Sequence, residues 1–313
     1  MRNIQFTMWL NRDIVSIGDF TKEEVMEVIK KANEMVPYAQ TGHPNKPLTG
    51  KIISTLFYEP STRTRLSFES AALRMGAQVL GFGSVESSSV SKGESLPDTI
   101  RILNGYSDAI VLRHPSEGAA RLASEFSDVP VINAGDGAGQ HPTQTLLDIF
   151  TIWKETGKVD GKNIGFVGDL KYGRTVHSLA KALSAFDVTI YLISPEELKI
   201  PKHIKKEIEK SVQVKESRDI ESVIEQLDIL YVTRIQKERF PDINEYNKVA
   251  GTYVIRPSLI SKGKKSLLVM HPLPRVNEIS PDVDNLPQAR YFKQASYGVP
   301  VRMAILDLIL RGE

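Results

Sequence analysis

A run of hydroxyl and guanidinium side chains follows the first strongly apolar segment of the sequence. Residues 52–58 lead through Glu59-Pro60 into Ser61-Thr62-Arg63-Thr64-Arg65, and a helical pattern begins within this segment. The start of a helix presents free backbone N–H groups and a positive dipole, and arginine binds phosphate oxygens through parallel hydrogen bonds. A single serine or threonine at this place would indicate only a helix cap. The combination predicts a site for a phosphate group.

Two further apolar segments of this half of the chain end in polar groups. Arg113 follows residues 108–112, and the glycine-rich residues 135–139 lead into Gln140-His141-Pro142-Thr143-Gln144. Pro142 suits the first position of a helix, which leaves His141 and Gln144 at the start of that helix. Each residue alone could be structural, so the prediction that they share a crevice with Arg63 depends on their occurring together.

The second half of the chain repeats the arrangement. Arg174 opens a helix after residues 163–167, and Arg234 follows residues 229–232. The glycines that precede Arg174 lack the Gly-x-Gly-x-x-Gly spacing of a dinucleotide-binding loop. A later strand runs into a turn stiffened by two prolines, His271-Pro272-Leu273-Pro274-Arg275.

Four arginines are therefore expected at the ends of strands: Arg63, Arg113, Arg174 and Arg234. Buried like charges without partners are costly, so the ligands should carry several negative charges, as a phosphate and carboxylates do. We expect no metal site, no cofactor and no covalent nucleophile. A cationic site of this composition suits acyl or carbamoyl transfer from a phosphorylated donor. A nicotinamide-dependent dehydrogenase and a two-lobed protein that only binds anions are the alternatives from other classes.

Strands and helices alternate along the chain. The expected strands are 52–58, 78–82, 108–112 and 130–133 in one sheet, and 163–167, 188–193, 212–214, 229–232 and 267–270 in another. The expected helices include 22–36, 65–75, 95–106, 117–126, 143–155 and 301–310. This pattern predicts an α/β fold with two doubly wound parallel-sheet domains joined by a helix, and a C-terminal helix that returns to the first domain. Ligands of such sheets bind at the carboxyl ends of the strands, where the strand order reverses.

The composition narrows the class of protein. The chain has 313 residues, of which 41% are hydrophobic and 25% charged, as expected for a globular protein of two domains. A net charge of +2 is small for a nucleic-acid-binding protein. The absence of cysteine fits a reducing compartment. The sequence shows neither a signal peptide nor an apolar run of about 18 residues. We therefore expect a cytoplasmic protein with no nucleic-acid or membrane partner.

Three motifs in this order resemble the aspartate/ornithine carbamoyltransferase family: Ser61–Arg65, His141–Gln144 and His271–Arg275. The resemblance extends over nearly the whole chain and includes Ser91-Lys92-Gly93-Glu94. It favours the aspartate branch, because ornithine enzymes carry a cysteine where Pro272 stands. In addition, arginines complement a dicarboxylate and would repel an ornithine ammonium.

The resemblance implies an enzyme that transfers the carbamoyl group of carbamoyl phosphate to the α-amine of L-aspartate. This is the committed step of de novo pyrimidine biosynthesis. A different amino acceptor, such as ornithine, is the alternative. Residues 1–141 with 297–313 are expected to form the carbamoyl-phosphate-binding domain, and residues 142–296 the aspartate-binding domain.

The resemblance also implies roles for individual residues. Carbamoyl phosphate is contacted by Ser61, Thr62, Arg63, Thr64, Arg113, His141, Gln144, Pro272 and Leu273. Aspartate is contacted by Ser88, Lys92, Arg174, Arg234, Gln236 and Leu273. The residues expected to take part in catalysis are Arg63, Thr64, Lys92, Arg113 and His141.

The loop that carries Ser88 and Lys92 resembles one that enters the active site of the adjacent subunit in a cyclic homotrimer. The aspartate amine is expected to attack the carbamoyl carbon directly, through a tetrahedral oxyanion and without a covalent enzyme intermediate. The sequence identifies no general base. It leaves open whether separate regulatory chains complete a dodecamer.

Overall fold

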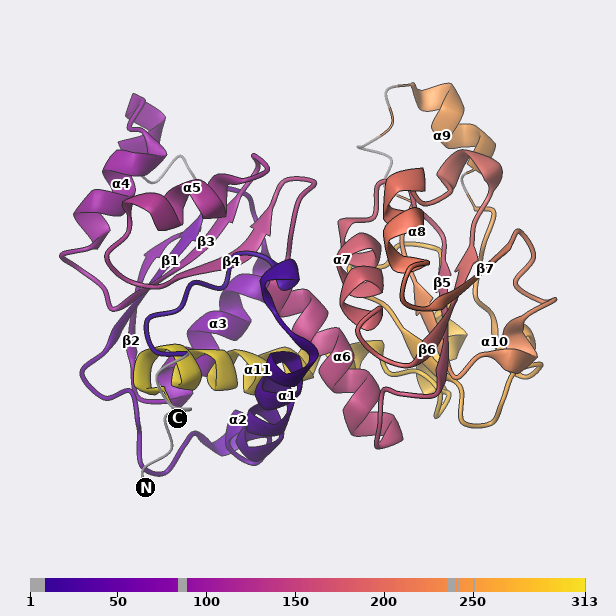
Figure 1. Ribbon diagram of the computed structural model, residues 1–313, viewed down its shortest axis with the longest axis horizontal. Coiled ribbons are helices and arrows are strands. Elements are labelled where there is room, and N and C mark those ends of the chain that lie inside the picture. The colour runs from indigo at the N-terminus through magenta and orange to yellow at the C-terminus, as the bar shows by residue number, and fades with distance from the viewer. Residues whose placement is uncertain (1–8, 84–88, 236–239, 241, 250, 313) are drawn as a thin grey trace. The chain divides into compact units, whose positions relative to one another are not determined.

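The computed structural model describes residues 9–83, 89–235, 240, 242–249 and 251–312 (Figure 1). The chain divides into two compact units, which we call unit 1 (Met1–Phe150 with Tyr297–Glu313) and unit 2 (Thr151–Ser296). The first division falls inside helix α6 (Pro142–Thr156), whereas the sequence analysis placed the boundary at the start of this helix. The second falls inside helix α11 (Tyr291–Arg311), so two helices connect the units.

Unit 1 contains a parallel sheet of four strands. In spatial order they are β2 (Gln78–Phe82), β1 (Ile52–Phe57), β3 (Ala109–His114) and β4 (Val131–Asp136). The chain leaves β1 for β2 on one side and then returns to place β3 on the other side. The strand order therefore reverses between β1 and β3, which is where ligands of open α/β sheets bind.

Helices cover both faces of the unit 1 sheet, as Figure 1 shows. Helices α4 (Leu96–Leu103) and α5 (Ala119–Phe126) pack on one face through apolar residues such as Ile100 and Ala123. Helix α3 (Thr62–Arg74) lies on the other face with α11 and buries Phe68 and Ala71. The N-terminal helices are α1 (Lys22–Met35) and α2 (Tyr38–Thr41). Covering both faces explains why the central strands are mostly apolar.

Unit 2 contains a second parallel sheet, of five strands. Their spatial order is β7 (Gln213–Ser217), β6 (Val188–Ile193), β5 (Lys162–Val167), β8 (Ile229–Val232) and β9 (Leu268–Met270). The helices of this unit are α7 (Arg174–Leu183), α8 (Lys202–Ile208), α9 (Ile243–Val249) and α10 (Pro257–Ile260). The strand order reverses between β5 and β8, so each unit has one such point.

Helix α11 is longer than the sequence analysis predicted. The expected helix was residues 301–310, yet α11 starts at Tyr291 and contains Pro300. Its C-terminal part belongs to unit 1, as expected for a terminal helix that returns to the first domain. Proline removes one backbone donor but does not end a helix whose two halves are both held by packing.

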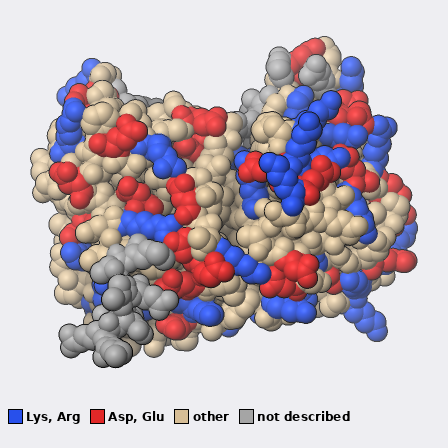
Figure 2. All heavy atoms as spheres, viewed as in Figure 1, with Lys and Arg blue, Asp and Glu red and all other residues tan. Residues whose placement is uncertain are grey.

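Acidic and basic side chains are interspersed over the face of the molecule shown in Figure 2. Within the described residues, no helix is long and apolar enough to cross a membrane.

Candidate active site

The hydroxyl-rich segment of unit 1 lies at the point where the strand order reverses. Ser61 occupies the position before the first residue of α3, and its side chain makes no capping hydrogen bond to the helix. Thr62 and Arg63 follow it in the first turn and are exposed, while Thr64 is buried. The first turn therefore offers free backbone donors and hydroxyl groups to an anion.

Arg63 and Arg113 lie close enough for their positive charges to interact. Arg63 is exposed overall but partly desolvated, which lowers its pKa, and the positive charge of Arg113 lowers the pKa further. Burial also lowers the pKa of Arg113, against the effect of Glu59, whose carboxylate lies 3.0 Å from Nη2 of Arg113. Arg113 reaches this place because β1 and β3 pair Phe57 with Arg113. Glu59 offsets one of the two positive charges, and a bound anion would offset the other.

Thr64 and His141 lie next to each other and are both buried. Thr64 Oγ1 and His141 Nε2 are 3.5 Å apart, which is too long for a strong hydrogen bond. A ligand oxygen could contact both atoms at normal hydrogen-bond distances of about 2.8 Å. The structure thus brings together residues of α3 and of the segment before α6, which are far apart in the sequence.

Gln144 has a defined orientation in the first turn of α6. Its side-chain NH₂ group donates to Asp148 Oδ1 at 2.9 Å, so the amide oxygen is the end left for a ligand. Asp148 is 0% exposed and raises the pKa of Arg302, a residue that is 2% exposed on α11. Burial outweighs this effect and lowers the pKa of Arg302 to about 10. The nearby Arg302 charge favours the ionised Asp148, and an ionised carboxylate can only accept hydrogen bonds.

Two features of unit 1 differ from the sequence-based interpretation. Arg65 donates to Glu69 at 2.7 Å along α3 and does not join Arg63. The glycine-rich loop packs against its own chain: a Cβ on Gly137, whose φ is +49°, would lie 2.4 Å from the Pro115 carbonyl oxygen. The glycines of this loop therefore allow close packing of two loops.

Arg174 and Arg234 occupy the corresponding place in unit 2. Arg174 is the first residue of α7, after β5, and Arg234 follows β8. The two loops are joined by Thr233, whose hydroxyl donates to the carbonyl of Val167 at 3.1 Å, and whose backbone approaches Gly168 closely. Both arginines are half-buried. They lie where carboxylate ligands are expected.

The turn after β9 contains Pro272 and Leu273, both half-buried. Leu273 has a φ of +57°, in the left-handed region. Arg275, the last residue of the motif, forms an ion pair with Asp284 and donates to Tyr291 Oη at 3.1 Å. It is therefore a structural residue of this unit.

Three expected residues remain, of which the structure describes only Lys92. Lys92 is exposed at the end of the short 3₁₀ helix η4 (Ser89–Lys92). Ser88 and Gln236 lie outside the described residues. Within the described part of the chain, no group of three or more His, Asp or Glu side chains is arranged to hold a metal ion.

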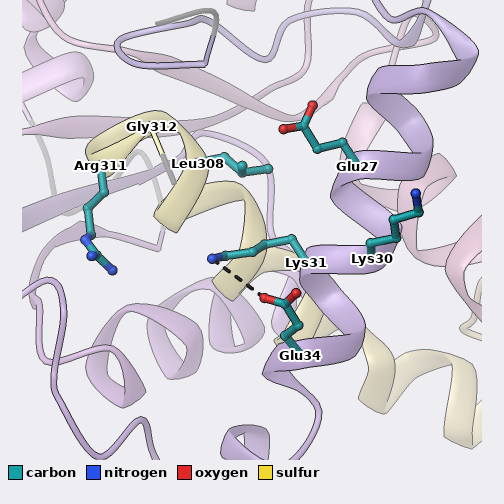
Figure 3. A pocket seen from close by; sticks show the side chains of 7 residues that line it. All are labelled: Glu27, Lys30, Lys31, Glu34, Leu308, Arg311 and Gly312. Carbon is teal, nitrogen blue, oxygen red and sulfur yellow. Dashed lines mark ion pairs between the residues drawn. The ribbon is translucent and has the colours of Figure 1, made fainter. Parts of the chain in front are cut away.

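A cavity of about 540 Å³ lies elsewhere in unit 1, between α1 and the end of α11 (Figure 3). Two of its three cations pair with a carboxylate of the protein: Lys31 lies 2.9 Å from Asp307, and Arg311 lies 3.1 Å from the same residue. A second acid, Glu34, lies 3.8 Å from Lys31. This cavity therefore lacks the excess positive charge of the Arg63–Arg113 site.

The sequence analysis did not identify three carboxylates that contact residues of the expected motifs. Glu59 pairs with Arg113, Asp148 orients Gln144, and Glu278 contacts His271 at 2.7 Å. The spacing of four residues between Gln144 and Asp148 on a helix was the one signal that could have indicated such a contact.

The fold and these contacts define the class: a two-domain α/β protein with a cationic ligand site at the strand-order reversal of each domain. Residues 12–154 match the carbamoyl-phosphate-binding domain of aspartate/ornithine carbamoyltransferases, and residues 160–309 match the aspartate/ornithine-binding domain. The chain belongs to the aspartate/ornithine carbamoyltransferase family.

Curated relatives and solved structures agree with this assignment. The chain is 57% identical to the aspartate carbamoyltransferase catalytic subunit of Thermococcus onnurineus, over 96% of this chain and 98% of the relative. It is similar to the solved catalytic subunit of Methanocaldococcus jannaschii, with a TM-score of 0.89, 56% identity, and coverage of 96% and 98% of the two chains. The Trypanosoma cruzi enzyme, solved with carbamoyl phosphate and aspartate, has a TM-score of 0.91 and 40% identity, over 96% of this chain and 98% of that one.

Proposed function

We propose that this protein transfers the carbamoyl group of carbamoyl phosphate to the α-amine of L-aspartate, giving N-carbamoyl-L-aspartate and phosphate. The observation that carries the proposal is the pair of cationic sites. Arg63 and Arg113 interact through their positive charges near the start of α3, as suits a phosphoryl group, and Arg174 and Arg234 follow neighbouring strands of unit 2. Relatives more than 55% identical are named as catalytic subunits of this activity. The reaction is the committed step of de novo pyrimidine biosynthesis.

Unit 1 binds carbamoyl phosphate. Its phosphoryl group takes hydrogen bonds from the start of α3 and from the arginines, through Ser61, Thr62, Arg63, Thr64 and Arg113. The carbonyl oxygen is polarised by Thr64, Arg113 and His141, and the 3.5 Å spacing of Thr64 and His141 supports a shared acceptor. The amine donates to the oxygen of Gln144, the atom that the bond to Asp148 leaves for it.

Unit 2 binds aspartate. Arg174 takes the α-carboxylate, and Arg234 with Gln236 takes the β-carboxylate, because guanidinium groups match carboxylates in bidentate fashion. Pro272 and Leu273 line the turn that receives the carbamoyl amine, with the Leu273 carbonyl as acceptor. An ornithine side chain would bring an ammonium group toward Arg234, which disfavours ornithine as the acceptor.

The chemical step needs no covalent enzyme intermediate. The neutral aspartate amine attacks the carbamoyl carbon, a tetrahedral oxyanion forms, and the C–O bond to phosphate breaks. The proton of the amine passes to the departing phosphate. Donors already aimed at the oxyanion, from Thr64, Arg113 and His141, provide the main electrostatic stabilisation, and removing one such donor typically costs about 3–4 kcal/mol.

The assembly is a cyclic homotrimer in the cytoplasm, and Ser88 and Lys92 serve the active site of the adjacent subunit. The exposed position of Lys92 on the short helix η4 is compatible with a contact to another chain.

An acceptor screen tests the function. Purified protein is incubated with carbamoyl phosphate and one amino acid at a time, and phosphate release is measured. We expect release that depends on L-aspartate, with ornithine, glutamate and D-aspartate at background. Release that depends on ornithine would move the protein to the other branch of its family, and release without any acceptor would contradict transfer.

A further inference from the structure

The turn after β9 is held by a buried histidine whose role the proposed reaction does not include. His271 is 2% exposed, and its backbone N–H donates to Gln294 Oε1 at 2.9 Å. Both ring nitrogens are engaged. Nδ1 lies 2.8 Å from the backbone N–H of Leu273, and Nε2 lies 2.7 Å from Glu278 Oε1.

These two contacts determine the protonation of the ring. A backbone N–H can only donate, so Nδ1 of His271 must be the acceptor and carries no proton. Nε2 then carries the proton and donates it to the carboxylate of Glu278. The ring is therefore the neutral Nε2–H tautomer, because a protonated imidazole would place two N–H groups against each other at Leu273.

Glu278 is itself held in place. Its Oε2 accepts from the backbone N–H groups of Val276 and Asn277, each at 3.1 Å. Burial opposes ionisation of Glu278, but His271 and these backbone donors outweigh it and keep the pKa of the carboxyl below its usual range. The carboxylate thus anchors the far side of the imidazole.

The residue that the histidine holds is in an unusual conformation. Leu273 has a φ of +57°, which residues other than glycine rarely adopt unless their surroundings maintain it. The hydrogen bond from its N–H to Nδ1 of His271 fixes the peptide plane on the N-terminal side of Leu273. Together with φ, this plane fixes the position of the Leu273 carbonyl carbon. The rotation ψ, which sets the direction of the carbonyl oxygen, is restricted by Pro274, the residue that follows.

We propose that His271 is a positioning residue for carbamoyl recognition. Through Nδ1, it maintains the left-handed conformation of Leu273 and so aims the Leu273 carbonyl at the amine of the donor substrate; Glu278 selects the tautomer that makes this possible. The inference rests on the proposed function, in which that carbonyl accepts from the carbamoyl amine.

Two substitutions of His271 test the contacts of its two ring nitrogens separately. His271→Asn places an amide oxygen near the position of Nδ1, so it keeps an acceptor for Leu273 and loses the contact with Glu278. His271→Gln reaches the position of Nε2, so it keeps a donor for Glu278 and loses the acceptor for Leu273. The variants are compared by equilibrium binding of carbamoyl phosphate and of acetyl phosphate, which has a methyl group in place of the amine.

We expect the glutamine variant to bind carbamoyl phosphate at least about tenfold more weakly than the asparagine variant, as one lost hydrogen bond plus an unsatisfied donor implies. Acetyl phosphate should bind both variants within about threefold of the unmodified protein, because it lacks the amine. Equal binding of carbamoyl phosphate to both variants would overturn the proposal, and so would equal weakening for both ligands.

A spectroscopic measurement on the unmodified protein covers the case in which a variant does not fold. In ¹⁵N-histidine-labelled protein, the His271 signals should show an unprotonated Nδ1 and a protonated Nε2 from about pH 6 to 8. A protonated Nδ1 would contradict the proposal. Carbamoyl transfer by the unmodified protein is measured in the same preparation; if it is present while the variants behave alike, the inference fails and the proposed function stands.

Discussion

Replacing Asp148 by asparagine should reverse the orientation of the side-chain amide of Gln144. In the structure the NH₂ group of Gln144 faces Asp148 at 2.9 Å, because an ionised carboxylate can only accept. An asparagine at this place would direct its oxygen toward the buried charge of Arg302 and its NH₂ group toward Gln144. Gln144 would then offer its own NH₂ group to the carbamoyl amine, and two donors would face each other.

The size of the effect follows from the hydrogen bond that is lost. A buried polar group left without its partner costs about 1–3 kcal/mol, which corresponds to a dissociation constant raised by about 5- to 150-fold. Acetyl phosphate should bind with nearly unchanged affinity. Calorimetric titration of Asp148→Asn with each ligand, without aspartate, measures both values.

Stability must be measured beside binding, because the charge of Asp148 also acts on the buried charge of Arg302. Asp148→Asn removes this attraction and should destabilise the protein, so the titrations belong at a temperature where the variant is folded. Gln144→Leu is the matched control, since it removes the amide and leaves the charges of Asp148 and Arg302. If Asp148→Asn weakened both ligands equally, the assigned orientation of Gln144 would be wrong.

Four further outcomes are expected. Arg63→Ala should weaken binding of inorganic phosphate by about 10-fold or more in calorimetry, because a charge-assisted contact is lost; unchanged affinity would move the phosphate site elsewhere. Arg234→Ala should raise the activation free energy that corresponds to kcat/KM for aspartate by about 2–5 kcal/mol and leave carbamoyl phosphate binding unchanged; wild-type kinetics would contradict the assignment. After verified subunit exchange, Lys92→Ala chains mixed with Arg63→Ala chains should regain activity in about a third of the sites of each mixed trimer; a mixture that stays inactive would mean that Lys92 does not act on a neighbouring chain. Glu278→Gln should unfold more easily than the unmodified protein above the ordinary carboxyl pKa of 4.5, and this difference should vanish as the pH falls, because a lowered pKa stabilises only the ionised form; a thermal-unfolding difference independent of pH would refute that reasoning.

The strands along the chain and the residues that follow them could be predicted from the sequence because both depend on local patterns. Strands 78–82, 188–193 and 229–232 have the expected bounds, since each is an apolar run between polar loops. The residues that follow strands necessarily gather at one edge of a parallel sheet. This reasoning placed Arg113 and Arg234 correctly at the ends of β3 and β8.

The partners of these residues could not be predicted, because they come from distant parts of the chain. Asp148 and Arg302 lie on different helices, and no local pattern links them. Arg63 and Arg65 look equivalent in the sequence, but residues two apart on a helix point about 200° away from each other. The charge of Arg63 therefore interacts with that of Arg113, while Arg65 pairs with Glu69 one turn further along α3.

The most direct test of carbamoyl transfer to aspartate follows the atoms themselves. Purified protein is given carbamoyl phosphate labelled with ¹³C at the carbonyl and L-aspartate labelled with ¹⁵N, and the products are observed by NMR. Transfer predicts a carbamoyl ¹³C signal split by a one-bond coupling to ¹⁵N, appearing at the rate at which phosphate is released. Phosphate release with the ¹³C label left uncoupled, or coupling only when ¹⁵N-ornithine replaces aspartate, would contradict the proposed function.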